Sequence, residues 1–447
     1  MEDELQVITE ETNPFFCLEH FLIKINFQLS SLSNDNPNSI EDFAQFLHEY
    51  THYLQTITTI NGISALLSFI DKFLHMTIDI AINIAKGNND SHLIIKNYKD
   101  DFDEFYNRLF WNRKPKKFSI FLDKPKYIIQ TIYNPIVKKQ TREVFIYNTI
   151  DGLFHHVSTK MLRENMAMMA SFSIRGIGQD SIMDHVTIYP TEDKPYKCKY
   201  WLIFNYFLYT YPNITNTVKF TYYFCELALM VINSGEFIEK LFRDIDIIMK
   251  ENKYENENVF FDKLWKLQVD YITNNSNVVM SIINNIKISL NNVVNDNEFY
   301  LPILKILELA EKGLKYKQNI SSTIYSNVMD RGWIDKMAKR FLSPIILQSN
   351  GFFTMLFEDE LYQNLLSILF GVTIISDKII KNENISYCPF LREIPICKLS
   401  NNDIYEICTD HPLDIPAFDK GGCLFYNAAL ILGLLKKEEF QKYIKND

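Results

Sequence analysis

The chain has 447 residues, of which 47% are hydrophobic and 23% are charged, and its formal net charge is −9. This composition is typical of a globular chain with large cores and room for roughly two or three domains. The acidic balance argues against a nucleic-acid-binding protein, which usually carries a basic surface. The basic run from Arg113 to Lys117 is short, and we expect it to be a solvated loop.

The sequence predicts a cytoplasmic protein with no membrane contact. Its first residues are acidic and lack a basic-then-apolar signal, and no apolar run reaches the roughly eighteen residues of a membrane span. Seven cysteines without tight pairing suit a reducing compartment better than a disulfide framework. None of the cysteines near the C-terminus has C-x-x-C spacing, so we expect free thiols at Cys388, Cys397, Cys408 and Cys423.

The first predicted elements are a strand, a polar loop and a helix. Residues 21–29 alternate in part and are rich in strand formers. Ser39 is a suitable N-cap, because an acidic residue follows three positions later. Apolar residues then recur at helical spacing as far as Ile57, and Asn61-Gly62 is a natural stop.

The middle of this predicted helix carries the pattern H-E-x-x-H, as His48, Glu49 and His52. Residues four apart lie on one face of a helix, so both imidazoles can reach a single metal ion. Glu49 lies about one hundred degrees round the helix, beside the metal and not on it. That is the place for a general base that acts on a metal-bound water. Ala44, Gln45 and Gln55 lie on the face beside the histidines, and we expect them to line the floor of a cleft.

A strand, a loop and a helix with H-E-x-x-H over residues 20–60 resemble the zincin metallopeptidases. The resemblance implies that His48 and His52 bind zinc, that Glu49 activates a water molecule, and that a third protein ligand comes from elsewhere. The metzincin extension of the motif requires glycine and histidine where this chain has Gln55 and Thr58, so that subclass is excluded.

Glu164 is the preferred candidate for the third zinc ligand. It lies in a capped, Met- and Ala-rich helical segment, residues 158–170. We expect a carboxylate in so apolar a segment to be partly buried, and a buried carboxylate needs a partner such as a zinc ion. Its placement also resembles the second-helix glutamate of gluzincin-like proteins. The alternative is a Glu164 carboxylate paired with Arg163, a lysine or a histidine.

Two other carboxylates remain open as third ligands. Glu226 lies in a similarly apolar segment, and Asp71 follows the motif at a spacing that resembles that of some gluzincins. Asp71 also fits an ordinary charge on the exposed face of a helix. His155 or His156, but not both, is a candidate second-shell group or oxyanion donor, and simple packing is the favoured explanation for each.

The rest of the chain predicts a small sheet and many helices. Strands are expected at 127–133 and 143–150, and they are expected to join residues 21–29 in one sheet. Further helices are expected at 63–85, 97–113, 217–250 with an interruption at Ser234-Gly235, 257–290, 297–316, 331–341 and 358–370.

The predicted fold class is therefore α+β and predominantly helical. We expect a zincin-like metallopeptidase domain at residues 1–250, with a small sheet and the H-E-x-x-H helix. Residues 251–447 are expected to form a mostly helical region that is regulatory or binds a partner. The division is placed near residue 250 because the segment that follows is polar.

The predicted function is zinc-dependent hydrolysis of a peptide or protein substrate. Zinc lowers the pKa of a bound water towards about 7, and Glu49 takes its proton as the water attacks the carbonyl carbon. Glu49 then returns the proton to the leaving amine. The alternative is a non-catalytic interaction protein on a zincin scaffold, whose helical half binds a protein partner. An intact Glu49 favours the enzyme, because a structural metal site has no use for a base.

Overall fold

The computed structural model describes most of the chain between residues 15 and 349. The described residues are 15–17, 22–29, 39–87, 91–109, 113–117, 122–134, 138–149, 151–175, 201–232, 234–251, 254–294, 301–319, 331–349, 353–354, 356, 372 and 376. The expected helix at 358–370 and the cysteines near the C-terminus lie outside this part of the chain.

The described residues are predominantly helical, as the sequence predicts. The helices are α2 (Ser39–Thr58), α3 (Ile60–Ala85), α4 (Ser91–Leu109), α5 (Thr159–Arg175), α7 (Leu202–Thr210), α8 (Thr217–Ala228), α9 (Ser234–Lys250), α10 (Glu257–Val294), α11 (Leu301–Asn319) and α13 (Arg331–Phe341). The interruption predicted at Ser234-Gly235 is where α9 begins, and α8 ends six residues earlier, at Ala228. No helix in the described ranges is both long enough and apolar enough to cross a membrane.

The expectation of one small sheet is wrong, because the strands form two. The strands are β1 (Phe15–Cys17), β2 (Leu22–Lys24), β3 (Tyr127–Asn134), β4 (Lys139–Asn148), β5 (Leu153–His156), β6 (Ile345–Leu347) and β7 (Phe353–Thr354). One sheet has the order β1-β2-β6-β7 and the other the order β3-β4-β5.

Chain connectivity explains the two sheets. β3 and β4 form an antiparallel hairpin whose pairs run from Tyr127↔Ile146 to Asn134↔Lys139, and β5 continues it on the other side of β4. Their β-branched and aromatic residues favour this local pairing. The short strand β2 pairs in parallel with β6, from Leu22↔Ile345 to Lys24↔Leu347. The strand β6 comes from the far end of the described chain, so local sequence patterns do not predict this pairing.

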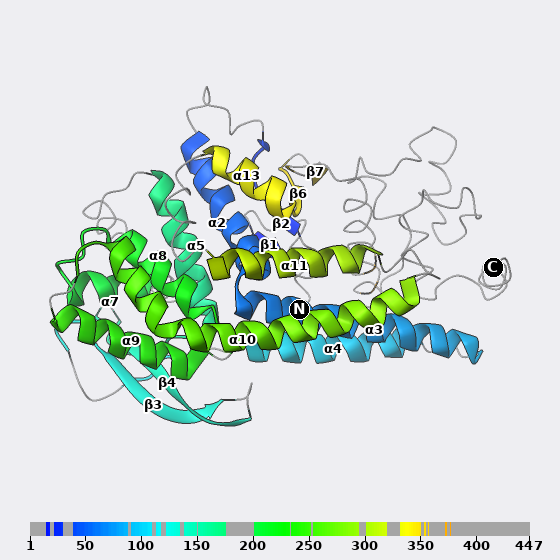
Figure 1. Ribbon diagram of the computed structural model, residues 1–447, viewed down its shortest axis with the longest axis horizontal. Coiled ribbons are helices and arrows are strands. Elements are labelled where there is room, and N and C mark those ends of the chain that lie inside the picture. Colours follow the sequence, from blue (N-terminus) through cyan, green and yellow to red (C-terminus); the bar gives the residue numbers. More distant parts are fainter. Residues whose placement is uncertain are drawn as a thin grey trace.

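Figure 1 shows how the helices surround α2. The helix α5 lies along one side of α2, while α13 and the sheet with β1, β2 and β6 lie on the other. The helices α3, α4, α10 and α11 run roughly along the long axis of the molecule, and α11 crosses next to α2. The β3–β4 hairpin packs beneath α9.

One hydrophobic core joins segments on both sides of residue 250. It contains buried residues of α2 such as Phe46 together with Leu314 of α11 and Ile346 of β6. Tyr53 of α2 donates its hydroxyl to the carbonyl of Phe341, at the end of α13, at 2.8 Å. The division into two domains near residue 250 stays a prediction, and the segments after it help to build the surroundings of α2.

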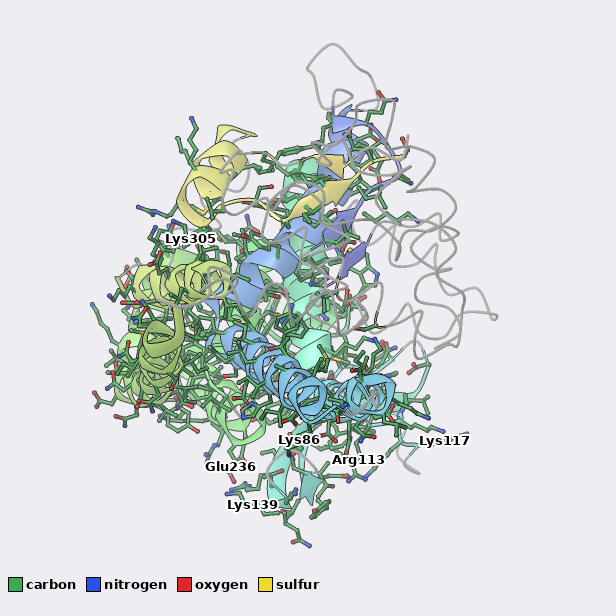
Figure 2. The ribbon with its side chains drawn as sticks, turned by 90° about the vertical axis from the view of Figure 1, so that its right-hand side faces the viewer. Lys86, Arg113, Lys117, Lys139, Glu236 and Lys305 are labelled. Carbon is green, nitrogen blue, oxygen red and sulfur yellow. The ribbon has the colours of Figure 1, made fainter. Side chains whose placement is uncertain are left out.

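The basic run is a surface segment that covers the hairpin. Lys114 and Lys117 are exposed, and the side chain of Lys117 points away from the ribbon, as does that of Lys139 (Figure 2). Lys116 is half-buried and donates to Gln130 Oε1 at 2.8 Å. Arg113 also donates to the carbonyl of Tyr133 at 2.9 Å, so the run is anchored on the sheet at Arg113 and Lys116 and exposed at Lys114 and Lys117.

The close approach of α11 to α2 makes Gly313 a test of this packing. A Cβ added at Gly313 would lie 1.8 Å from the carbonyl oxygen of Ile57, so α11 would have to move. We expect Gly313→Ala to lower the free energy of unfolding by about 1–3 kcal/mol. Glycine to alanine inside a helix normally has the opposite sign.

Urea unfolding followed by circular dichroism measures this change. The control is Lys312→Ala, an exposed position on the same helix, where we expect a change within about 0.5 kcal/mol. A Gly313→Ala variant as stable as the wild type would contradict the described contact.

Candidate metal centre

The two histidines lie on the one stripe of α2 that is not buried. From Phe43 to its end at Thr58, α2 is buried apart from Gln45, His48 and His52. These three residues follow helical spacing, so they share a face. The apolar residues that predict the helix from the sequence also fill its buried sides, which leaves only this stripe for chemistry.

The facing helix α5 has a matching stripe. It is buried along most of its length, and its less covered positions include Lys160, Glu164 and Met168, each four residues from the next. Small and flexible neighbours such as Ala167 and Met166 allow close packing on α2. The half-buried stripes of the two helices meet at Glu164.

Glu164 lies between the two motif histidines. Its Oε2 atom is 3.6 Å from His48 Nε2 and 3.5 Å from His52 Nε2. One ligand atom from each of the three residues falls within 4.8 Å of the others. The side chains keep exposed fractions of 19%, 12% and 24% for His48, His52 and Glu164, so an ion from solvent can reach them.

This donor set fits a zinc ion. Two imidazole nitrogens and a carboxylate oxygen are ordinary zinc ligands, and bonds of about 2.1 Å place tetrahedral ligand atoms roughly 3.4 Å apart. The distances of 3.6 Å and 3.5 Å from Glu164 to the two histidines agree with that separation. A direct charge-assisted hydrogen bond would be shorter, at about 2.7–2.9 Å.

Glu49 lies beside the cluster in a more buried position. Its Oε1 atom is 3.9 Å from His48 Nε2, and the residue is 7% exposed. Burial raises the pKa of the Glu49 carboxyl to about 7, against the pull of His48. The Glu164 carboxylate raises the pKa further, and a backbone hydrogen bond from Phe16 of β1 lowers it. A carboxyl with a pKa near neutrality is suited to accept and return a proton.

Glu164 differs from Glu49 in its electrostatics. Burial raises the pKa of the Glu164 carboxyl, but the two histidines outweigh burial and hold the pKa well below 4.5. Glu164 is therefore an anion throughout the neutral range, as a metal ligand must be.

Two residues next to the cluster have contacts that the sequence does not predict. Gln55, which we expected to line a cleft floor, is fully buried, and its Oε1 atom lies 3.0 Å from His52 Nδ1. Arg163, considered only as a partner for Glu164, donates to the carbonyl of His52 at 3.2 Å and to Thr56 Oγ1 at 3.0 Å. The signal for Gln55 was its spacing, because residues three apart on a helix are neighbours.

The alternative third ligands lie outside the cluster. Glu226 forms a buried ion pair with Lys317, which links α8 to α11. Burial lowers the pKa of the Lys317 ammonium well below its usual value. Asp71 is 59% exposed and faces His75 across one helical turn, as expected for a surface charge.

His155 and His156 are buried and have carboxylate partners of their own. His155 Nε2 lies 2.7 Å from Asp151 Oδ2, and His156 Nε2 lies 3.3 Å from Glu143 Oε2. Neither histidine belongs to the three-residue cluster of the described chain. Their contacts fit a structural role in holding the hairpin sheet together.

Comparison of the chain with protein-family models, curated proteins and solved structures finds no match. The site therefore has to be interpreted from its own residues.

The buried Glu143 gives a prediction for acid stability. Burial raises the pKa of its carboxyl, but hydrogen bonds from His156, Thr141 and Asn134 outweigh burial, and the net pKa lies below 4.5. The folded-state pKa is thus lower than the unfolded one. The carboxylate stabilises the fold above about pH 4.5, and this contribution is lost as the pH falls through the folded-state pKa.

We expect Glu143→Gln to lower the free energy of unfolding by about 1–3 kcal/mol at neutral pH, because it breaks a buried hydrogen-bonded group. The difference from the wild type should shrink in acid. Urea unfolding from neutral pH to about pH 3 tests this expectation. Asp123→Asn, at an exposed position, serves as the control. A difference that stays constant across this pH range would contradict the role given to Glu143.

Proposed function

We propose that this protein is a zinc-dependent peptide hydrolase of the zincin type. The observation that carries the proposal is the convergence of His48, His52 and Glu164, with Glu49 beside them. Glu164 is far from the motif in sequence, so the H-E-x-x-H pattern alone does not bring it there. A second helix that supplies a carboxylate beside two motif histidines supports a gluzincin-like arrangement.

His48, His52 and Glu164 would hold the zinc ion. When bound, zinc would supply a Lewis acid that polarises the substrate carbonyl and makes water a better nucleophile. With three protein ligands, one coordination position is left for water or substrate. This ligand set is the one found in catalytic and not in closed structural zinc sites.

Glu49 would be the proton carrier. Its Oε1 atom lies next to the cluster, so it can accept a proton from the attacking water and deliver it to the nitrogen of the leaving amine. An amide is the natural substrate for such a pair, because it needs both an activated water and a protonated leaving group. We therefore propose peptides or proteins as substrates. We also propose a cytoplasmic location, and the region after residue 250 as the place where a regulatory partner binds.

Metal content tests the ligands. We expect about one zinc per wild-type chain and a sharp loss in Glu164→Ala, because two histidines alone bind zinc weakly. Elemental mass spectrometry of protein purified without chelators, and again after zinc is supplied, measures it. Glu308→Ala on the surface of α11 is the matched control and should retain its zinc. A wild-type protein that takes up no metal after reconstitution would refute the proposal.

Activity tests the base. We expect Glu49→Gln to keep its zinc and to lose about 10²–10⁴-fold in kcat, because the amide cannot carry the proton. Cleavage of a mixed peptide library, followed by mass spectrometry, measures activity on many sequences at once, whatever the cleavage specificity. Zinc bound without cleavage of any peptide or protein would favour the alternative of an interaction protein on a zincin scaffold.

A further inference from the structure

The helices α2 and α5 hold each other's backbone directly behind the cluster. Gln55 of α2 donates its Nε2 hydrogen to the carbonyl oxygen of Arg163 at 2.9 Å. Arg163 of α5 donates its guanidinium hydrogen to the carbonyl oxygen of His52 at 3.2 Å. Gln55 is fully buried and Arg163 is 8% exposed, so water competes little for these bonds. Arg163 directly precedes Glu164, the candidate carboxylate ligand. The hydrogen bond that Arg163 donates ends on the backbone of His52, a candidate histidine ligand.

These bonds determine which way the Gln55 amide points. A backbone carbonyl can only accept a hydrogen bond, so the amide must turn its NH₂ group towards Arg163. Its Oε1 atom then faces His52 Nδ1, at 3.0 Å. The amide orientation thus follows from the fixed carbonyl, and not from a choice between two similar atoms.

The amide in turn determines the tautomer of His52. An amide oxygen can only accept, so His52 Nδ1 must carry the hydrogen. In a neutral imidazole the lone pair then lies on Nε2. Nε2 is the atom 3.5 Å from Glu164 Oε2 and within the three-residue cluster.

This arrangement places electron pairs, and no hydrogen, on the cluster side of a neutral His52. In this neutral state the Nε2 lone pair and the Glu164 carboxylate face each other with no hydrogen between them, and a cation that lies between them satisfies both. Without Gln55, the simplest state would be Nε2–H donating to Glu164, which satisfies both groups without any metal. The hydrogen bonds that link the Arg163 carbonyl, the Gln55 amide and His52 Nδ1 form a relay that excludes that state. They leave a site that a divalent cation completes.

We propose that Gln55 is a positioning residue that holds His52 in the Nδ1–H tautomer and so makes its Nε2 atom a metal ligand. The proposal rests on the proposed function in taking zinc as the metal, but the tautomer is a property of the metal-free protein. Because the Gln55 amide is bonded to the backbone beside Glu164, it also ties the His52 ring to the position of the carboxylate ligand on α5.

The test combines nuclear magnetic resonance with metal affinity. Metal-free protein is labelled with ¹⁵N-histidine and studied at mildly alkaline pH, and the His52 signal is assigned by its loss in His52→Gln. Two variants separate the two bonds of the amide. Gln55→Met keeps the size and removes both bonds, whereas Gln55→Glu keeps an acceptor for His52 and removes the donor to Arg163. Gln268→Met, at a fully buried glutamine of α10 that donates to Asp244 and lies outside the cluster, is the matched control.

We expect Nδ1–H in the wild type, in Gln55→Glu and in the control, and a shift towards Nε2–H in Gln55→Met. Zinc affinity, measured by competition with a chromogenic chelator, should fall about 10–100-fold in Gln55→Met and stay unchanged in the control. If the role of Gln55 were purely structural, Gln55→Met would leave the His52 tautomer unchanged. The tautomer would then not depend on whether residue 55 carries an acceptor.

Nε2–H in the metal-free wild type would overturn the proposal, and so would a Gln55→Met variant with unchanged tautomer and zinc affinity. If Gln55→Met does not fold, the tautomers of the wild type and of Gln55→Glu still decide. Failure of the proposed function is distinguishable, because a protein with the expected tautomer and bound zinc but no peptide cleavage refutes the hydrolase and not the relay.

Discussion

The packing of α5 against α2 is the interaction on which the rest of the candidate site depends. The H-E-x-x-H motif supplies two imidazoles by helical spacing alone, but the carboxylate that faces them comes from another helix. That helix is buried along most of its length, so its axial position is set by many apolar contacts at once. A shift of one turn would move Glu164 by about 5.4 Å and take it out of reach of both histidines.

Polar hydrogen bonds between α2 and α5 act together with this apolar packing and add direction to it. The Gln55 amide and the Arg163 guanidinium each end on a backbone carbonyl of the opposite helix. Buried polar groups are costly unless they are paired, so a shifted register would leave both side chains unsatisfied. The same bonds that align the helices also orient a candidate ligand, which couples the stability of the fold to the geometry of the site.

Much of the site could be predicted from local sequence. The acidic first turn of α2, its apolar spacing and the motif place His48 and His52 on one helix face. The apolar surroundings of Glu164 predict a partly buried carboxylate, and the structure brings it to the histidines, although metal binding stays a prediction. By the same argument Glu226 is also buried, but Lys317 of a distant helix neutralises it. Composition around a residue predicts burial and does not predict the partner.

The errors arose where partners are distant in sequence. The three residues of β2 gave no sign of a parallel partner at Ile345–Leu347, so strands that belong to two sheets were assigned to one. Gln55 has a polar side chain beside two histidines, and exposure in a cleft was the simplest interpretation of that pattern. Its burial depends on α5, whose backbone carbonyl at Arg163 accepts its amide hydrogen. Backbone acceptors leave no mark in the sequence, because every residue has one.

The two carboxyl groups of the candidate site show how one environment gives the same chemical group two different pKa values. Both are removed from water, which raises the pKa of each. Glu164 faces both histidines, and their attraction for the anion outweighs burial, so its pKa falls well below 4.5. Glu49 is more buried than Glu164, the negative charge of Glu164 raises its pKa further, and its pKa is about 7. When the pKa values of two neighbouring carboxyl groups differ in this way, the group that stays an anion is suited to bind a cation. The group that titrates near neutral pH is suited to move a proton. The proposed division of labour between Glu164 as ligand and Glu49 as base therefore rests on position, because residue type alone does not distinguish the two.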